Sequence, residues 1–301
     1  MLSKTNNCYF IGTLVEVKNK KEGSYSKDGV DYPYISLDIV VKSNVEINGE
    51  VVEVTNELRN FTNKFTKSGT VNANYNTLCN IDELLNKRVV VSGATLQGTR
   101  FWSAKTNQLV PSTKYNFNIV RPAKADDKDT ATFSFSGFVY KPLTERTDAD
   151  NNVEYYQMSL AQANYKEDGM HVVDFIVDKD NLKAIQVIES KYEQGSTIEI
   201  FGICKNIVTN VTKTEETAFG EPITRILPRS DKKLVITQGK EPIIGEGEYT
   251  IEDIKRLNAA FIAEGEQIKN KAVNTASAPA TNNASSPAKP MSKKSALAGL
   301  I

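Results

Sequence analysis

The feature of this sequence that most restricts its fold is an order of elements that occurs twice. Short runs rich in β-branched and aromatic residues predict strands. In the first half they occupy residues 9–17, 32–41, 50–54, 88–96 and 115–120. In the second half they occupy residues 133–140, 155–160, 171–177, 196–203 and 234–237. A short helix is predicted between the third and fourth strands of each half, at residues 79–85 and 181–192.

Three strands, a short helix and two strands form the element order of an OB-fold, a five-stranded Greek-key barrel. A glycine lies at the same place in the first strand of each half, Gly12 and Gly137, and a second pair, Gly93 and Gly202, lies in the fourth. Glycine inside a strand is typical of a barrel corner or a bulge. We therefore predict a mainly β protein with tandem five-stranded OB-like Greek-key barrels at residues 1–125 and 126–240. A generic β-sandwich, or two unrelated small β domains, is the alternative.

A different pattern follows the predicted barrels. Residues 241–271 indicate a linker and an amphipathic helix with Thr250 as its N-cap. Its apolar stripe contains Ile251, Ile254, Leu257, Phe261 and Ile268. The helix either packs on the second barrel or binds another protein. Residues 272–301 predict a disordered tail, because their composition cannot bury enough apolar surface to offset the entropy of ordering.

The charge is balanced overall and uneven along the chain. Lys and Arg number 37, as do Asp and Glu. Residues 1–125 hold 16 basic and 11 acidic residues, a net +5, while residues 126–240 hold 14 and 19, a net −5. Residues 241–266 hold 2 and 7, a net −5, and residues 267–301 hold 5 and none, a net +5. Such asymmetry is a clue to partners.

Several functional classes are excluded by composition. No stretch approaches the ~20 apolar residues of a membrane helix, and the N-terminus lacks the apolar run of a signal peptide, so we expect no membrane association and a cytoplasmic location. The three cysteines are far apart and form no CxxC pair, and there is a single histidine. We therefore expect no disulfide framework, no metal site and no cofactor. No catalytic motif occurs, which predicts a protein that is not an enzyme.

Two segments of the first half lack acidic residues. Residues 84–125 contain seven cations and no Asp or Glu, and include Arg88, Arg100, Trp102 and Lys105. Residues 58–81 contain Arg59, Phe61, Lys64 and Lys67. An OB barrel binds its ligand on strands two and three and on the one–two and four–five loops. Both segments fall near that surface, as do Tyr32 and Tyr34 and a predicted basic loop at residues 18–29.

This interleaving suits single-stranded nucleic acid. Lys and Arg neutralise phosphates and release counterions, while aromatic faces stack on bases without requiring a sequence. The alternative is that Phe61, Phe65 and Phe101 are core residues and that the lysines are merely solvated. In the acidic second half Tyr156, the counterpart of Tyr34, is the best candidate. That half either extends the path of the strand or binds a protein.

The architecture of residues 7–240, together with a flexible tail ending in the apolar tip 298–301, resembles that of phage-type single-stranded DNA-binding proteins with tandem OB-folds. The resemblance implies a protein that coats and protects single-stranded DNA in replication, recombination or repair. It also implies recruitment of replication or recombination proteins, here through residues 241–301, and a location in the host cytoplasm if a phage encodes the chain. Many such proteins have acidic tails, whereas residues 267–301 here are basic. The alternatives are an RNA-binding or protein-only OB module, a structural virion β protein and, last, a nuclease.

Overall fold

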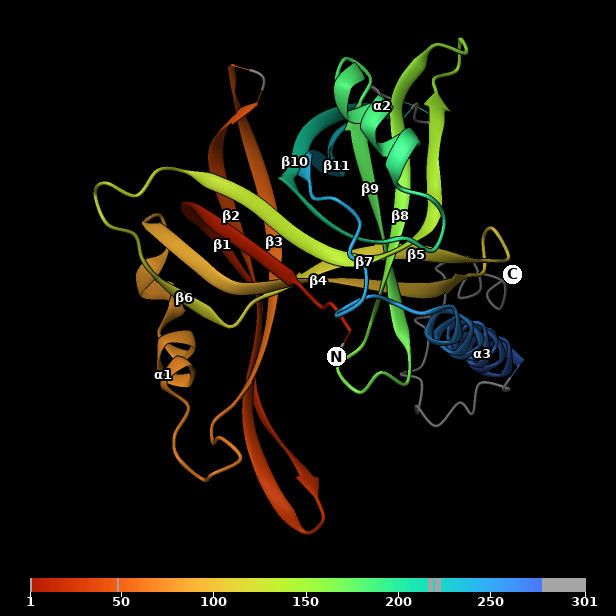
Figure 1. Ribbon diagram of the computed structural model, residues 1–301. Helices are drawn as coiled ribbons and strands as arrows, with labels where there is room; N and C mark the ends of the chain where they lie inside the picture. The colour runs from red at the N-terminus through yellow and green to blue at the C-terminus, as the bar shows by residue number, and fades with distance from the viewer. Residues whose placement is uncertain (1, 48, 216–218, 220–222, 278–301) are drawn as a thin grey trace, which may run out of the picture.

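The computed structural model describes residues 2–47, 49–215, 219 and 223–277, and shows a mainly β protein with a long C-terminal helix (Figure 1). The first strands are β1 (Asn6–Lys27), β2 (Val30–Ile47), β3 (Glu50–Asn63), β4 (Arg88–Ser103), β5 (Gln108–Asn116) and β6 (Ile119–Pro122). They are followed by β7 (Thr130–Thr147), β8 (Val153–Ala163), β9 (Met170–Asp178), β10 (Thr197–Glu215) and β11 (Ile223–Gly239). The helices are α1 (Ala73–Cys79), the 3-10 turn η1 (Ile81–Leu84), α2 (Leu182–Lys191) and α3 (Ile251–Ser277).

Five strands of the first half close into a ring. β1 pairs with β2, β2 with β3 and β4 with β5, all antiparallel. The ring closes through the antiparallel β1–β4 pair and through a short parallel pair in which Leu58 of β3 lies opposite Tyr115 of β5. Alternate residues such as Ile35, Leu37 and Ile39 point to the buried side, as expected for strands with one face on a core.

The strands of the second half pair in the same order as those of the first half. β7 pairs with β8, β8 with β9, β10 with β11 and β10 with β7. A single parallel bridge between Val235 of β11 and Ile176 of β9 joins the remaining two strands. The predicted repetition of element order therefore has a counterpart in the strand pairing.

The two halves are packed closely against each other. Residues Asn6–Ile11 of β1 pair with Thr130–Phe135 of β7, which makes one continuous sheet. β4 crosses β9 so closely at Gly98 that a side chain there would overlap the backbone of Val172. Most of the buried apolar residues of both halves belong to one core cluster.

The glycines that the sequence analysis matched in the first strand of each half lie where the backbone of a neighbouring strand comes close. An added Cβ at Gly12 would overlap the carbonyl oxygen of Lys42 on β2, and one at Gly137 would overlap that of Ala161 on β8. Both glycines lie in the first strand of a half, where it crosses its neighbour. The equivalence of Gly12 and Gly137 inferred from the sequence is thus matched by equivalent geometry.

Several predicted boundaries were wrong. The predicted loop at 18–29 is strand almost throughout, because β1 and β2 extend as a hairpin arm that turns at Asp28 and Gly29. The fifth strand predicted at 115–120 is instead the end of β5 followed by β6. The first helix begins at Ala73 rather than at residue 79, with the side chain of Asn72 accepting the backbone N–H of Asn74.

The two later helices lie where the sequence placed them. α2 has Asn181 as its N-cap, whose side chain accepts the N–H of Ala184. At the start of α3, Thr250 Oγ1 accepts the backbone N–H of Asp253 at 3.2 Å, and the Asp253 carboxylate accepts from Thr250 in return. α3 continues to Ser277, past the boundary predicted at residue 271 and close to Pro279, before which a helix is expected to end. The predicted tail from residue 278 onward lies outside the described residues.

Candidate nucleic-acid interface

Four aromatic side chains gather on the outer face of the first three strands; Tyr25, Tyr32, Tyr34 and Phe61 are called the aromatic cluster below. Tyr34 and Phe61 stack with their ring centroids 4.9 Å apart, and Tyr25 stacks on Tyr32 at 5.4 Å. Tyr25 links the two pairs, since its ring lies 6.2 Å from that of Tyr34 and 6.4 Å from that of Phe61. Phe61 remains 55% exposed, so an apolar ring face is available to a ligand.

The register of the strands brings these rings together. Tyr25 of β1 lies opposite Tyr32 of β2, and Gly23 lies opposite Tyr34. Because side chains alternate along a strand, Tyr32 and Tyr34 share the outer face while Ile35 and Leu37 face the core. Gly23 leaves room for the Tyr34 ring, which an added Cβ would approach to 2.9 Å at the hydroxyl. The hairpin arm of β1 and β2 is thus the platform on which the cluster is built.

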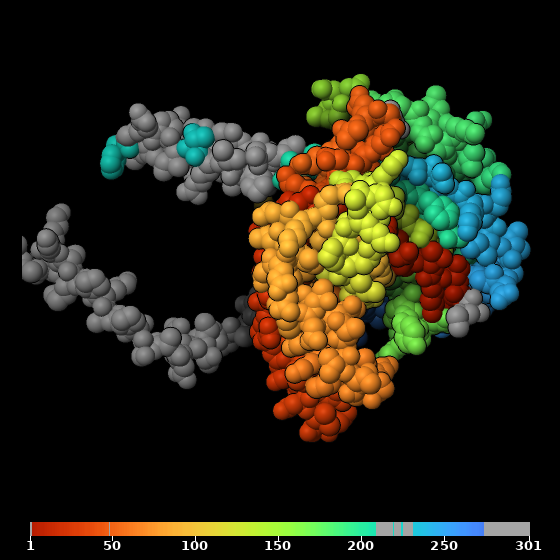
Figure 2. All heavy atoms as spheres, turned by 90° about the vertical axis from the view of Figure 1, so that its left-hand side faces the viewer, coloured from red at the N-terminus to blue at the C-terminus, as the bar shows by residue number. Residues whose placement is uncertain are grey.

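Cations border the aromatic cluster. Arg59 lies on β3 two residues before Phe61, and its Nε is 4.0 Å from the Asp38 carboxylate across the β2–β3 pair. Lys64 follows β3, and its Nζ lies 5.7 Å from the ring centroid of Phe65. Lys67 is exposed in the loop beyond. In Figure 2 the surface formed by this loop and α1 lies beside the tip of the β1–β2 arm.

Arg88 is held away from this surface by the segment between the two halves. Its Nη2 donates to the carbonyl oxygen of Asp127 and to the carboxylate of Asp129, each at 2.6 Å. Its position at the start of β4 explains this contact, because β6 ends beside it and leads directly into residues 123–129. The structure therefore gives Arg88 a structural ion pair.

The β4–β5 hairpin carries the other predicted residues, and α3 packs against it. Arg100 Nη2 donates to the carbonyl oxygen of Phe261 at 2.7 Å and to the Glu264 carboxylate at 2.9 Å. The guanidinium carbon lies 3.4 Å from the centroid of the Phe261 ring, and the Arg100 side chain is only 14% exposed. Trp102 is half-buried, with Lys269 of α3 at 5.8 Å from its ring.

The hairpin and the aromatic cluster point to different sides of the molecule. β4 and β5 extend toward α3, whereas the β1–β2 arm extends to the bottom of the view (Figure 1). Lys105 lies exposed in the turn at the tip of the hairpin. The structure thus brings together Tyr32, Tyr34, Arg59, Phe61, Lys64 and Lys67, and separates them from Arg100, Trp102 and Lys105.

The candidate predicted in the second half, Tyr156, does not lie on an outward face. Tyr156 packs partly against the core and donates its hydroxyl to Glu145 at 3.2 Å. Its neighbour Tyr155 faces outward, with Lys233 at 4.8 Å from its ring. Tyr156 lies on the same face of β8 as the buried Met158 and Leu160, so Tyr155 is on the outward face, as Tyr34 is on β2.

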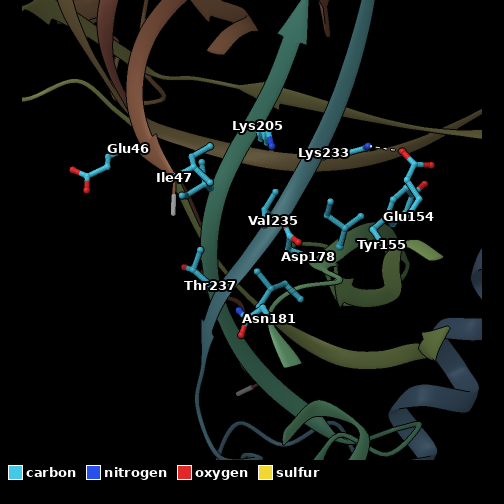
Figure 3. Close-up of a pocket in the computed structure, with 13 residues that line it drawn as sticks. Glu46, Ile47, Glu154, Tyr155, Asp178, Asn181, Lys205, Lys233, Val235 and Thr237 are labelled. Carbon is cyan, nitrogen blue, oxygen red and sulfur yellow. Dashed lines mark hydrogen bonds and ion pairs between the residues drawn. The ribbon is translucent and has the colours of Figure 1, made fainter. Parts of the chain in front are cut away.

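Tyr155 and Lys233 line a cavity of about 380 Å³ between the second half and the β2–β3 hairpin (Figure 3). The Lys233 ammonium is paired with Glu154 at 3.3 Å and with Asp231 at 3.1 Å. Glu46 and Asp178 also line the cavity. These carboxylates oppose the binding of phosphate, so the second half is the weaker candidate for a nucleic-acid surface.

The described part of the chain contains no group of three or more His, Cys, Asp and Glu side chains placed to hold a metal ion. It also contains no helix that is both long and apolar enough to cross a membrane. The single histidine of the sequence, His171, lies half-buried with its Nε2 at 3.5 Å from the Asn6 amide nitrogen.

Comparison with known proteins gives a family for the chain. The family model YorF matches residues 4–275. The chain belongs to the YorF family. No curated protein matches its sequence.

Two solved structures resemble this member of the YorF family over most of its length. A deletion mutant of the single-stranded DNA binding protein from Thermus aquaticus aligns at 11% identity over 80% of this chain and 96% of its own, with a TM-score of 0.48. A replication protein A heterotrimer bound to single-stranded DNA aligns at 9% identity over 87% of this chain and 53% of its own, with a TM-score of 0.23.

Sequence reasoning placed Tyr25 of this YorF-family chain in the basic loop near the predicted surface, but missed the strand that pairs it with Tyr32. It was assigned to a loop because residues 18–27 are polar on both sides of the strand. The turn pair Asp28-Gly29 was the available signal, since this dipeptide is typical of a two-residue hairpin turn. Pairing outward from that turn would have placed Tyr25 opposite Tyr32.

Proposed function

We propose that this protein binds single-stranded DNA with little dependence on sequence, and that the aromatic cluster is the principal contact surface. The observation that carries the proposal is the stacking of Tyr34 on Phe61 at 4.9 Å on an exposed sheet face with cations on its border. Exposed rings stack on bases of any identity, and cations attract the backbone. Stacking requires unpaired bases, which a duplex does not expose, so a duplex is a poorer ligand.

The strand pairings support the proposal that each half is an OB-fold, with barrels at residues 1–125 and 126–240. The first half closes into a five-strand ring, and the second repeats the same pairings. In an OB-fold the ligand lies across strands two and three. The aromatic cluster occupies β2 and β3 together with the arm of β1, which is the expected surface.

Coating and protecting single strands during replication, recombination or repair is the role that such binding would serve, and no enzymatic step is proposed. The distribution of charge favours nucleic-acid binding by the first half and another role for the second. The first half is net +5 and holds the aromatic cluster, whereas the second half is net −5. The acidic half is a candidate surface for protein partners rather than for the nucleic-acid backbone.

Fluorescence anisotropy with labelled oligo-dT, a duplex of equal length and oligo-U tests the proposal. Binding to oligo-dT should weaken as salt rises from about 50 to about 200 mM, and the duplex should bind less well. Equal affinity for oligo-U would favour the alternative of an RNA-binding module. Absence of binding to any nucleic acid at low salt would leave a protein-only or structural virion role.

A further inference from the structure

A cavity of about 470 Å³ opens directly beside the aromatic cluster. Phe61 belongs both to the aromatic cluster and to the lining of the cavity, so a DNA strand stacked on the cluster would pass the mouth of the cavity. The other walls come from the end of β3, the loop that follows it, the start of α1 and the segment before β6. We call this cavity the amide pocket, because Asn63, Asn72, Asn74 and Asn118 all line it.

The amide pocket has aromatic walls suited to a flat ring. Phe61 lies on β3, and Phe65 lies on the loop that follows it, where its backbone forms an isolated β-bridge with Val71. The Phe65 side chain is 42% exposed. Backbone hydrogen bonds hold that loop in place, from Lys64 N to the Pro33 carbonyl and from Asn72 N to the Lys64 carbonyl, each 2.8 Å. A nucleobase in the cavity would therefore meet the Phe65 ring on a loop whose backbone is held in place.

The charge of the pocket also fits a nucleotide. Lys67 lines it, and Lys64 lies against the ring of Phe65. Among the lining residues that the structure describes there is no carboxylate. This composition differs from that of the cavity around Lys233, where three carboxylates oppose a phosphate.

The asparagines supply the groups that distinguish one base from another. Carboxamides present a donor and an acceptor in one plane and pair with the edges of bases. Asn63 Nδ2 donates to the Tyr25 hydroxyl at 3.2 Å, while its Oδ1 is shielded from solvent and has no hydrogen-bond partner among the described residues. Asn63, which lines the pocket, thus holds an acceptor without a partner, and a base with an exocyclic amino group would supply the missing donor.

We propose that the amide pocket holds one base of the bound strand and favours a base that carries an exocyclic amino group. This inference rests on the proposed binding of single-stranded DNA and adds a base preference to it. Phe61 and Phe65 stack on the base, Asn63 accepts from its amino group, and Lys64 and Lys67 lie near its phosphate.

Anisotropy with oligo-dC and oligo-dT of equal length tests the base preference, because both bases are pyrimidines and only cytosine carries an exocyclic amino group, at position 4. One hydrogen bond predicts that oligo-dC binds about threefold more tightly or more. Asn63→Ala should bring the ratio of the two affinities close to one. Asn76→Ala is the matched control, since Asn76 is exposed on α1 and does not line the pocket.

The ratio separates this inference from the general proposal. Any loss of the Asn63–Tyr25 hydrogen bond affects both oligonucleotides, so it changes the affinities and not their ratio. Equal binding of oligo-dC and oligo-dT, tighter binding of oligo-dT, or a ratio unchanged by Asn63→Ala would overturn the base preference while leaving single-strand binding intact. Absence of binding to both oligonucleotides would overturn the general proposal as well.

Discussion

Tyr34 on β2 and Phe61 on β3 stack with their ring centroids 4.9 Å apart, although 27 positions separate them in the sequence. Phe61 lies opposite Ser36 in the strand register, so its ring reaches diagonally to Tyr34 over the small serine side chain. Diagonal neighbours in an antiparallel pair are within reach of aromatic side chains. The stacked pair therefore forms a continuous apolar surface across two strands.

Removing either ring of this pair should weaken single-strand binding. Base stacking contributes roughly 1–3 kcal/mol per base, so Phe61→Ala should raise the dissociation constant for oligo-dT about tenfold. Tyr165→Ala is the control, because Tyr165 is 96% exposed in the turn between β8 and β9. A Phe61→Ala protein that is folded and binds as tightly as the unsubstituted chain would rule out the aromatic cluster as the contact surface.

The cations that border the cluster should control the dependence of binding on salt. Each phosphate contact in single-stranded DNA contributes about 0.7 to the slope of log K against log salt. Arg59→Gln and Lys64→Gln should each reduce that slope by about this amount. Lys183→Gln on α2 should leave the slope unchanged, and a salt series by anisotropy makes the comparison. Equal slopes in all these variants would show that the cations do not contact phosphate.

Arg100 should act on stability and not on DNA affinity. Arg100→Ala removes two hydrogen bonds to α3 and the contact with Phe261, and hydrogen bonds of charged groups contribute about 1.5–3 kcal/mol each. We expect a lower free energy of unfolding in urea and nearly unchanged affinity for oligo-dT. Lys105→Ala, in the exposed turn, should change neither quantity. A large loss of affinity with unchanged stability would restore Arg100 to the binding surface.

His171 should make the protein less stable as the pH falls. Burial lowers the pKa of His171 to about 4, whereas the unfolded chain binds the proton near pH 6.5. Between these values the unfolded state holds more protons than the folded state, so the stability lost from about pH 7 to about pH 4 approaches about 3 kcal/mol. Urea unfolding at several pH values measures it, with His171→Gln as the comparison. Equal pH dependence in both proteins would contradict this prediction.

The order of strands could be predicted from the sequence because most strands have one face on the core. Ile35, Leu37 and Ile39 alternate with polar residues for that reason. The hairpin arm could not be predicted in this way, because residues 21–27 are solvated on both faces of the strand and show no alternation of apolar and polar residues. The start of α1 was missed because the segment 72–76 is rich in asparagine, which is a poor helix former and a good N-cap.

The residues of the site could be predicted where their contacts are close in the sequence, and could not where the contacts join distant parts of the chain. Tyr32, Tyr34, Arg59 and Phe61 lie on paired strands joined by one hairpin, so their proximity follows from the register. The burial of Arg100 depends on a helix 161 positions away, which no local pattern reveals. Tyr156 was matched to Tyr34 by an offset of 122 residues, whereas the equivalent contacts of Gly12 with Lys42 and of Gly137 with Ala161 give an offset of 119. An odd change of register exchanges the two faces of a strand.

Affinity for oligo-dT against a duplex of equal length, measured for the unsubstituted chain and for the double variant Tyr34→Ala with Phe61→Ala, tests the central proposal most directly. We expect the unsubstituted chain to prefer the single strand and to bind it less tightly as salt rises. The double variant, folded by circular dichroism, should lose that preference. Tighter binding of the duplex, or a folded double variant with unchanged affinity for oligo-dT, would contradict single-strand binding through the aromatic cluster.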